Sequence, residues 1–232
     1  MEIKVLASGS SGNCVYISDG MTSLLLDAGI KFSSIQKGLN FQLSKVTGCL
    51  LTHEHGDHSG AIQSIIKSGV DCYMSRGTAE ALGLNGHRIH IIEAMKQIQV
   101  GTWAIKPFQT HHDAQEPLAF LLANQLHEKV LYATDTAYLA FKFQGLTHIL
   151  IGCDYSMEIL KAGVTEGTVN RQLKRRIVQT HMSLERLLDM LRANDLSMLQ
   201  EIHLLHLSKT NADAEMFKRK VQEATGKPTY VV

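Results

Sequence analysis

The segment THEHGDHSG, residues 52–60, places three histidines and one aspartate within the six positions from His53 to His58. His53 and His55 are two residues apart, so in an extended backbone their rings point the same way and can meet one ion. Asp57 and His58 follow where the chain turns, and we expect them to face a second ion. Nitrogen and oxygen donors without thiolates suit Zn, Mn or Fe and leave positions open for water. The motif predicts a metal centre rather than a solvated, histidine-rich loop.

Further ligands are expected directly after apolar strand runs, because such positions gather at one edge of a sheet. The run WAIKPFQT is followed by His111 and His112, KVLYAT by Asp135, and EIHLL by His206. An aspartate can bridge two cations, so Asp135 would complete a two-metal centre. The residues alone leave open which of His111 and His112 is the ligand.

The elements that must position these residues can be predicted from apolar patterning. Strands are expected at 3–8, 14–18, 23–29, 46–52, 70–75, 89–92, 103–108, 117–124, 129–135, 147–154, 201–208 and 228–232. Helices are expected at 61–69, 78–84, 183–195 and 211–227, with Ser183 as an N-cap and Gly226 as a stop. The last of these should bury Ala214, Phe217, Val221 and Ala224. Two sheets with helices on their outer faces follow from this pattern.

Composition excludes several classes of protein. The 232 residues suit one large domain or two small ones, and a net charge of +1 predicts neither nucleic-acid nor membrane binding for the molecule as a whole. No apolar run approaches the roughly 18 residues that span a bilayer. The four cysteines lie far apart, which argues against thiolate zinc sites and a disulfide scaffold. We expect a cytoplasmic protein with reduced thiols.

The order HxHxDH, then His, then Asp, then His resembles the metallo-β-lactamase fold superfamily over essentially the whole chain. The resemblance implies one domain, residues 1–232, of α/β class: a four-layer αββα sandwich of two mixed β-sheets flanked by helices. It assigns His53, His55 and His112 to one metal ion and Asp57, His58 and His206 to a second, with Asp135 bridging. The run LLLDAG looks like the superfamily's first motif, which places Asp27 behind the ligands. Two divalent ions, Zn or Mn, are the implied cofactors.

The run PFQTHHDAQEPLAF resembles a narrower subgroup, the WalJ/YycJ-like and VicX-like bacterial proteins, and so does ASGSSGN at residues 7–13. This alignment places the ligand at His112 and leaves His111 at a variable position. The chain departs from the subgroup at Ala119, where glycine is usual, and at Leu184, where asparagine is usual. Small residues in ASGSSGN allow the backbone to approach a site, where Asn13 could bind phosphate, although a simple β-turn explains them equally well.

Two downstream features point toward phosphodiester chemistry. The runs IGCDYS and THMSLERLLDML resemble tRNA 3′-processing ribonucleases, in which an acidic residue and a histidine form an acid relay, here Asp154 and His181. A cationic imidazole there can hold the scissile phosphate and protonate the leaving oxygen. The free amides of the helix predicted after Ser183 would also favour phosphate. The basic run NRQLKRR either binds a phosphate backbone or is a solvated helix face.

The sequence thus predicts a dinuclear metal-dependent phosphodiesterase, most specifically a 5′→3′ DNA exonuclease, an activity that comes from the subgroup resemblance. Metal-activated hydroxide would attack phosphorus, Asp57 would orient that water, and Asp154 and His181 would assist the leaving group. The expected partner is a nucleic acid, DNA before RNA, and no membrane; protein partners are not predicted. The alternatives are a hydrolase of thioesters, lactones or lactams on the same fold, or a non-catalytic metal-binding regulatory module. An iron redox enzyme is a more distant option.

Overall fold

The structure is a computed structural model that describes residues 1–232, and the chain divides into two compact units. Unit 1 comprises Met1–Gln109 and Ala114–Glu128, and unit 2 comprises Thr110–Asp113 and Lys129–Val232. The prediction that residues 1–232 form one domain stays a prediction. No helix combines the length and the apolar character needed to cross a membrane.

Unit 1 contains a mixed sheet of six strands that lie in chain order. The first three strands pair antiparallel and the next three join in parallel. The strands are β1 Glu2–Ala7, β2 Cys14–Ser18, β3 Ser23–Leu26, β4 Val46–Leu50, β5 Asp71–Met74 and β6 Ile89–Ile91. All six were predicted from their apolar runs. The unit also holds an antiparallel meander of β7 Ile98–Val100, which was not predicted, β8 Trp103–Gln109 and β9 Leu118–Ala123.

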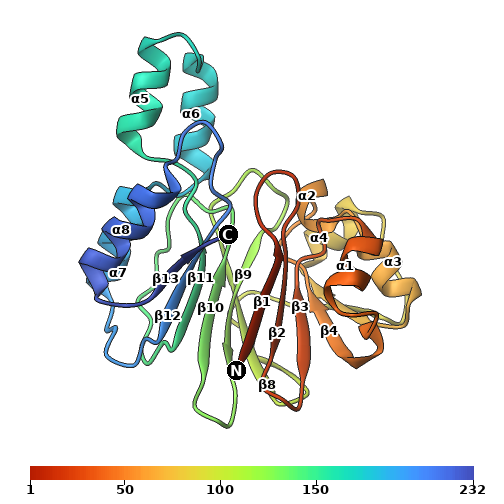
Figure 1. Ribbon diagram of the computed structural model, residues 1–232. Helices are drawn as coiled ribbons and strands as arrows, with labels where there is room; N and C mark the ends of the chain where they lie inside the picture. The colour runs from red at the N-terminus through yellow and green to blue at the C-terminus, as the bar shows by residue number, and fades with distance from the viewer. The chain divides into compact units, whose positions relative to one another are not determined.

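Three helices of unit 1 lie beside the six-stranded sheet (Figure 1): α1 Phe32–Gly38, α3 Ile62–Lys67 and α4 Arg76–Ala81. Ile35 of α1 and Ile65 of α3 are fully buried against Leu25, Cys49 and other sheet residues in one apolar cluster. All four cysteines of the chain are buried and unpaired by disulfides. This core, whose residues lie in the N-terminal part of the sequence, supports the loop after β4 that carries the HxHxDH motif.

Unit 2 contains four parallel strands in chain order: β10 Lys129–Ala133, β11 His148–Gly152, β12 Glu201–Leu205 and β13 Thr229–Val231. Their interior residues are almost continuously buried, as expected for parallel strands covered on both faces. Because parallel strands align their carboxyl ends, Asp135, Asp154 and His206 follow β10, β11 and β12 at the same edge.

The helices of unit 2 are α5 Met157–Thr165, α6 Arg171–Thr180, α7 Leu184–Ala193 and α8 Ala214–Thr225. Ser183 caps α7 and Gly226, with φ of 66°, ends α8, as predicted. Phe217 and Val221 are buried as expected, whereas Ala214 and Ala224 are exposed, so the predicted apolar face of α8 was too wide. Helices α5 and α6 form a pair that packs over a small cluster of Tyr155, Leu160 and Val169.

Candidate metal centre

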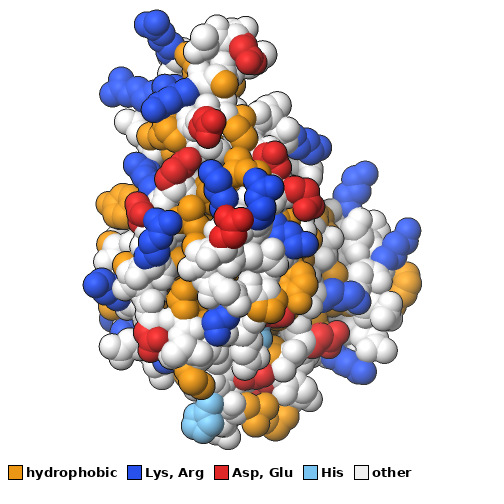
Figure 2. Space-filling view, turned by 60° about the vertical axis from the view of Figure 1, so that its left-hand side comes forward, with side chains coloured by type: hydrophobic (Ala, Val, Ile, Leu, Met, Phe, Trp, Pro, Cys, Tyr) orange, Lys and Arg blue, Asp and Glu red, His pale blue; other side chains and the backbone are white.

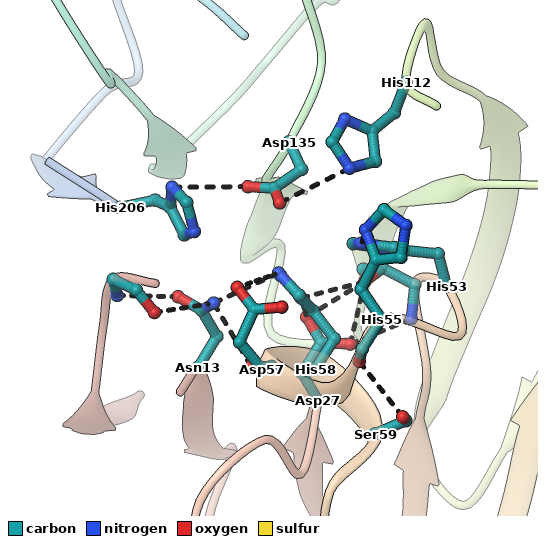
Figure 3. A network of polar contacts seen from close by, with 12 residues as sticks. Asn13, Asp27, His53, His55, Asp57, His58, Ser59, His112, Asp135 and His206 are labelled. Atoms are coloured by element: carbon teal, nitrogen blue, oxygen red, sulfur yellow. Dashed lines mark hydrogen bonds and ion pairs between the residues drawn. The ribbon is translucent and has the colours of Figure 1, made fainter. Parts of the chain in front are cut away.

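The predicted ligands divide between the two units, four in unit 1 and three in unit 2. In unit 1, His53 lies in the loop that follows β4, and helix α2, Gly56–Ser59, begins directly after His55. The His53 Nε2 and His55 Nδ1 atoms lie 3.1 Å apart, with the rings nearly perpendicular (Figure 3). Two nitrogens on one tetrahedral zinc ion would be about 3.3 Å apart. The pair therefore converges on one point in the way that the i, i+2 spacing predicted.

His58 and Asp57 are the next two predicted ligands of unit 1. The His58 ring is fully buried, its centroid is 4.1 Å from that of His53, and its Nε2 is 3.6 Å from Asp57 Oδ2. The carboxylate of Asp57 keeps 24% of its surface exposed. The pair His53 and His55 is thus adjacent to the pair Asp57 and His58. Their spacing is compatible with two ions roughly 3.5–4 Å apart in a dinuclear site.

Asp27 lies behind these ligands in unit 1, as the superfamily resemblance implied. It is fully buried, and its carboxylate accepts hydrogen bonds from the Thr52 amide at 2.8 Å and from His58 Nδ1 at 2.8 Å. The Thr52 hydroxyl also donates to Asp27 at 2.9 Å, so its lone pair is left to accept from His53 Nδ1 at 3.0 Å. Both imidazoles therefore carry their hydrogen on Nδ1 and keep the Nε2 lone pair for an ion.

Replacement of Asp27 by asparagine should weaken metal binding by about 10- to 100-fold, because the amide cannot accept from His58 and Thr52 as the carboxylate does. Metal affinity can be measured by competition with a chromogenic chelator, alongside a circular dichroism melt. Asp71→Asn is the matched control, since Asp71 is a half-exposed carboxylate of the same unit. Equal affinity for the Asp27→Asn variant and the wild-type protein would show that Asp27 does not orient the ligands.

The glycine-rich turn at residues 7–13 holds the ligand loop in place. The Gly12 amide donates to the Gly9 carbonyl at 2.9 Å, which closes the turn, and the Asn13 amide donates to the Asp57 carbonyl at 2.7 Å. The Asn13 side-chain nitrogen lies 3.1 Å from His58 Nε2. A Cβ on Gly29 would lie 1.7 Å from the Asp57 carbonyl oxygen, so only glycine permits this approach. The β-turn reading is confirmed, and a phosphate contact from Asn13 stays a prediction.

In unit 2, Asp135, Asp154, His181 and His206 offer ligand atoms within 4.8 Å of one another. Asp154 Oδ1 accepts a hydrogen bond from His206 Nδ1 at 2.6 Å and lies 3.2 Å from His181 Nδ1. The predicted pairing of Asp154 with His181 is present. Its contact with His206 was not predicted: the same carboxylate orients a predicted metal ligand and the predicted proton donor.

The electrostatics of this cluster separate the roles of its members. Burial raises the pKa of Asp154, but the adjacent imidazoles of His181 and His206 outweigh it, so the pKa falls below the usual value. Burial lowers the pKa of His181, but the adjacent carboxylate of Asp154 outweighs that effect and raises it overall. The ion pair therefore favours a cationic His181, which is the form that can hold a phosphate and donate a proton.

His112 and His111 differ sharply in their surroundings. His112 Nδ1 donates to the Thr180 carbonyl at 3.1 Å, and its Nε2 lies 3.6 Å from Asp135 Oδ2. Burial, the largest effect, lowers the pKa of His112 and outweighs the charge of Asp135, which favours the neutral imidazole that a metal ion requires. His111 is exposed and stacks on Tyr138. These contacts support the choice of His112, although the ligand assignment itself stays a prediction.

The amides at the start of α7 were expected to favour phosphate, and two of them are occupied. The Leu184 amide donates to the Tyr155 carbonyl at 2.9 Å, and the Arg186 amide donates to the Ser183 hydroxyl at 3.2 Å. These two donors serve the fold and are not available to a phosphate.

Three residues of the two half-sites adopt left-handed backbone: Asp27, Asp135 and His206, with φ of 60°, 44° and 56°. Aspartate and histidine tolerate this conformation better than most residues, but it still costs on the order of 1 kcal/mol or more relative to glycine. Each of the three residues closely follows the end of a strand, so the end of that strand determines the position of its Cα atom.

The donor set fits a divalent metal ion. His53, His58, His112 and His206 each have Nδ1 beside a carboxylate, hydroxyl or carbonyl oxygen, which makes Nε2 the ring nitrogen that would bind an ion. Such oriented imidazoles with neighbouring carboxylates form the usual environment of Zn and related ions in proteins.

Comparison with known proteins gives a consistent result. Residues 22–204 match the family model described as the beta-lactamase superfamily domain. Over 229 residues the chain is 30% identical to the exodeoxyribonuclease WalJ of Streptococcus pneumoniae, covering 91% of this chain and 83% of that relative. It is 25% identical over 186 residues to the exodeoxyribonuclease YycJ of Bacillus anthracis, covering 75% and 70% of the two chains.

The fold is shared with a solved structure, the metallo-beta-lactamase fold protein YhfI of Bacillus subtilis, at a TM-score of 0.75 and 14% identity, over 99% of this chain and 95% of that one. This likeness confirms the predicted α/β class with two mixed sheets flanked by helices. The family match over most of the sequence and the relationship to WalJ agree on one assignment. The chain belongs to the family of beta-lactamase superfamily domains and is a relative of the WalJ and YycJ proteins.

Proposed function

We propose that this protein is a two-metal phosphodiesterase that acts as a DNA exonuclease. The observation that carries the proposal is the ion pair of Asp154 with His181, 3.2 Å long, on the strand edge that also carries Asp135 and His206. A phosphodiester needs both a neutralised phosphate and a protonated leaving oxygen, and this pair can supply both. The names of the WalJ and YycJ relatives, both exodeoxyribonucleases, support the same substrate class.

The metal ligands proposed are those of the sequence: His53, His55 and His112 for one ion, Asp57, His58 and His206 for the other, and Asp135 between them. Two divalent ions, Zn or Mn, would lower the pKa of the attacking water and stabilise negative charge on the phosphate oxygens. Within the protein, Asp27 and Asp154 hold the imidazoles of His58 and His206 in the orientation that binding requires. Asp57, the most exposed carboxylate of the set, orients the water.

His181 is proposed to act on the leaving group, opposite the attacking water. Its imidazolium, kept charged by Asp154, donates a proton to the sugar oxygen as the phosphorus–oxygen bond breaks. Because the Thr180 carbonyl receives the hydrogen bond of His112, the end of α6 fixes His112 and His181 together.

A basic helix face leads to this turn. Helix α6 carries four cationic residues and no acidic one, and its Arg171, Arg175 and Arg176 are exposed. Figure 2 shows Lys and Arg side chains gathered at the top of the view, where Figure 1 places α5 and α6. Arg176 is engaged with Asp113 at 2.9 Å, so Arg171, Lys174 and Arg175 are the charges left to contact a phosphate backbone. A cytoplasmic location, with DNA as the partner, is part of the proposal.

An activity panel on the metal-loaded protein tests the proposal. Single- and double-stranded DNA and RNA, labelled at the 5′ or 3′ end, are incubated with Mn, Zn or Mg, beside thioester, lactone and lactam substrates. We expect release of mononucleotides from the 5′ end of DNA and at least about tenfold lower rates on RNA, with His55→Ala as the inactive control. Hydrolysis of a thioester, lactone or lactam without cleavage of any nucleic acid would overturn the assignment.

A further inference from the structure

His111 and Tyr138 of unit 2 form an exposed aromatic pair that neither metal binding nor the acid relay uses. Their ring centroids are 4.1 Å apart and the planes differ by 16°, which is a stacked arrangement. Tyr138 is 45% exposed and His111 is also exposed. A flat aromatic surface that remains open to solvent can receive a further planar group.

Hydrogen bonds of the backbone hold the two loops of this pair together. The His111 amide donates to the Thr136 hydroxyl at 3.1 Å, and the Ala137 amide donates to the His111 carbonyl at 3.1 Å. The Thr136 hydroxyl in turn donates to the Tyr138 carbonyl at 2.8 Å. Arg186 adds a hydrogen bond to the Ala137 carbonyl at 3.0 Å. The two rings are therefore presented in a fixed orientation, which lowers the entropy cost of binding.

Two other tyrosine–histidine stacks show what distinguishes this one. His203, stacked on Tyr230, pairs with Glu201 at 3.0 Å, and His90, stacked on Tyr73, lies 3.6 Å from Asp71. In both of these stacks, a neighbouring carboxylate interacts with the histidine and holds it in position. The His111 ring has no such carboxylate, and its stack lies in the two loops that carry His112 and Asp135.

We propose that His111 and Tyr138 form a stacking platform for a nucleobase next to the scissile phosphate. The inference rests on the proposed nuclease function, and it adds a base contact to the phosphate contacts of that function. His111 directly precedes the proposed ligand His112, and Tyr138 follows Asp135 by three residues, so the platform and two of the proposed ligands share the same two loops of unit 2. Stacking accepts every base, since each has a π face, which suits an exonuclease that moves along any sequence.

The test compares oligonucleotides that differ by a single base. Single-stranded DNA with an abasic residue at the first, second or third position from the cleaved end is compared with the intact strand, by cleavage and by fluorescence anisotropy. For the wild-type protein we expect the abasic residue at one position to weaken binding and raise KM by on the order of tenfold. Tyr138→Leu should abolish that difference, and Tyr138→Phe should restore it.

Tyr230→Leu is the matched control, because it removes an exposed tyrosine stacked on a histidine elsewhere in unit 2, and it should keep the full difference. If Tyr138→Leu keeps the wild-type difference at that one position, the platform is overturned while the nuclease assignment stays intact. Failure of the wild-type protein to cleave or bind DNA overturns the nuclease assignment, and with it the platform. Because anisotropy needs no cleavage, the two failures are told apart.

Discussion

Replacement of Asp135 by alanine should reduce DNA hydrolysis by about 10³-fold or more and lower the bound metal per chain. Asp135 is buried, with one carboxylate oxygen 3.6 Å from His112 Nε2 and the other 3.5 Å from His206 Nδ1. Its removal leaves two imidazoles without the anion that would balance a pair of divalent ions. Metal content after dialysis, by mass spectrometry, and turnover of end-labelled DNA measure the two effects.

The control for this variant is Asp189→Ala, because Asp189 is a highly exposed carboxylate of the same unit. It should keep both metal and turnover. His55→Ala provides a second ligand variant, in unit 1, and should reduce turnover by a similar factor. Near-normal turnover in both Asp135→Ala and His55→Ala would exclude a two-metal mechanism.

Replacement of His181 by alanine should reduce DNA turnover by about 10²- to 10⁴-fold while the metal content remains unchanged. The effect should depend on the leaving group, because His181 is proposed to protonate it. A nucleoside p-nitrophenyl phosphate, whose leaving group departs without protonation, should lose much less activity than DNA. A purely structural defect would reduce both substrates equally, so the ratio of the two losses isolates proton donation.

The position of His181 defines the result that would contradict its proposed role as a proton donor. His181 lies in the same group of close ligand atoms as Asp135, Asp154 and His206. Loss of metal together with activity would show that His181 is itself a ligand. His87→Ala, a change at an exposed histidine of unit 1, controls for the general effect of removing an imidazole.

Local features of the site could be predicted from the sequence because short spacing fixes geometry. The i, i+2 relation of His53 and His55 needed only an extended backbone, and the strand ends after KVLYA and EIHLL marked Asp135 and His206. The contact of Asp154 with His206 could not be predicted in this way, since 52 residues separate them. It depends on β11 and β12 being parallel neighbours with Gly152 opposite Leu205, a pairing that no local pattern specifies.

The same reasoning explains the elements that were missed or overextended. Strand β7, Ile98–Val100, is as short as β6 and β13, but its residues alternate apolar and polar and do not form an apolar run like IHII or YVV. Helices α5 and α6 depend on a small cluster around Tyr155 and Leu160, so tertiary packing stabilises them more than an apolar pattern does. On α8, Ala214 and Ala224 matched the helical period but are exposed, because alanine favours helices wherever it lies.

The left-handed backbone at Asp27, Asp135 and His206 places stability and activity in opposition during evolution. Glycine would relax the backbone at each position, yet it would delete a proposed metal ligand at Asp135 or His206 and, at Asp27, the acceptor for the buried Thr52 amide and His58. Selection for folding alone would therefore drift toward the loss of these side chains, and only selection for activity retains them. A laboratory lineage enriched for thermostability without an activity screen would be expected to lose the strained residues of the site before those of the sheet core.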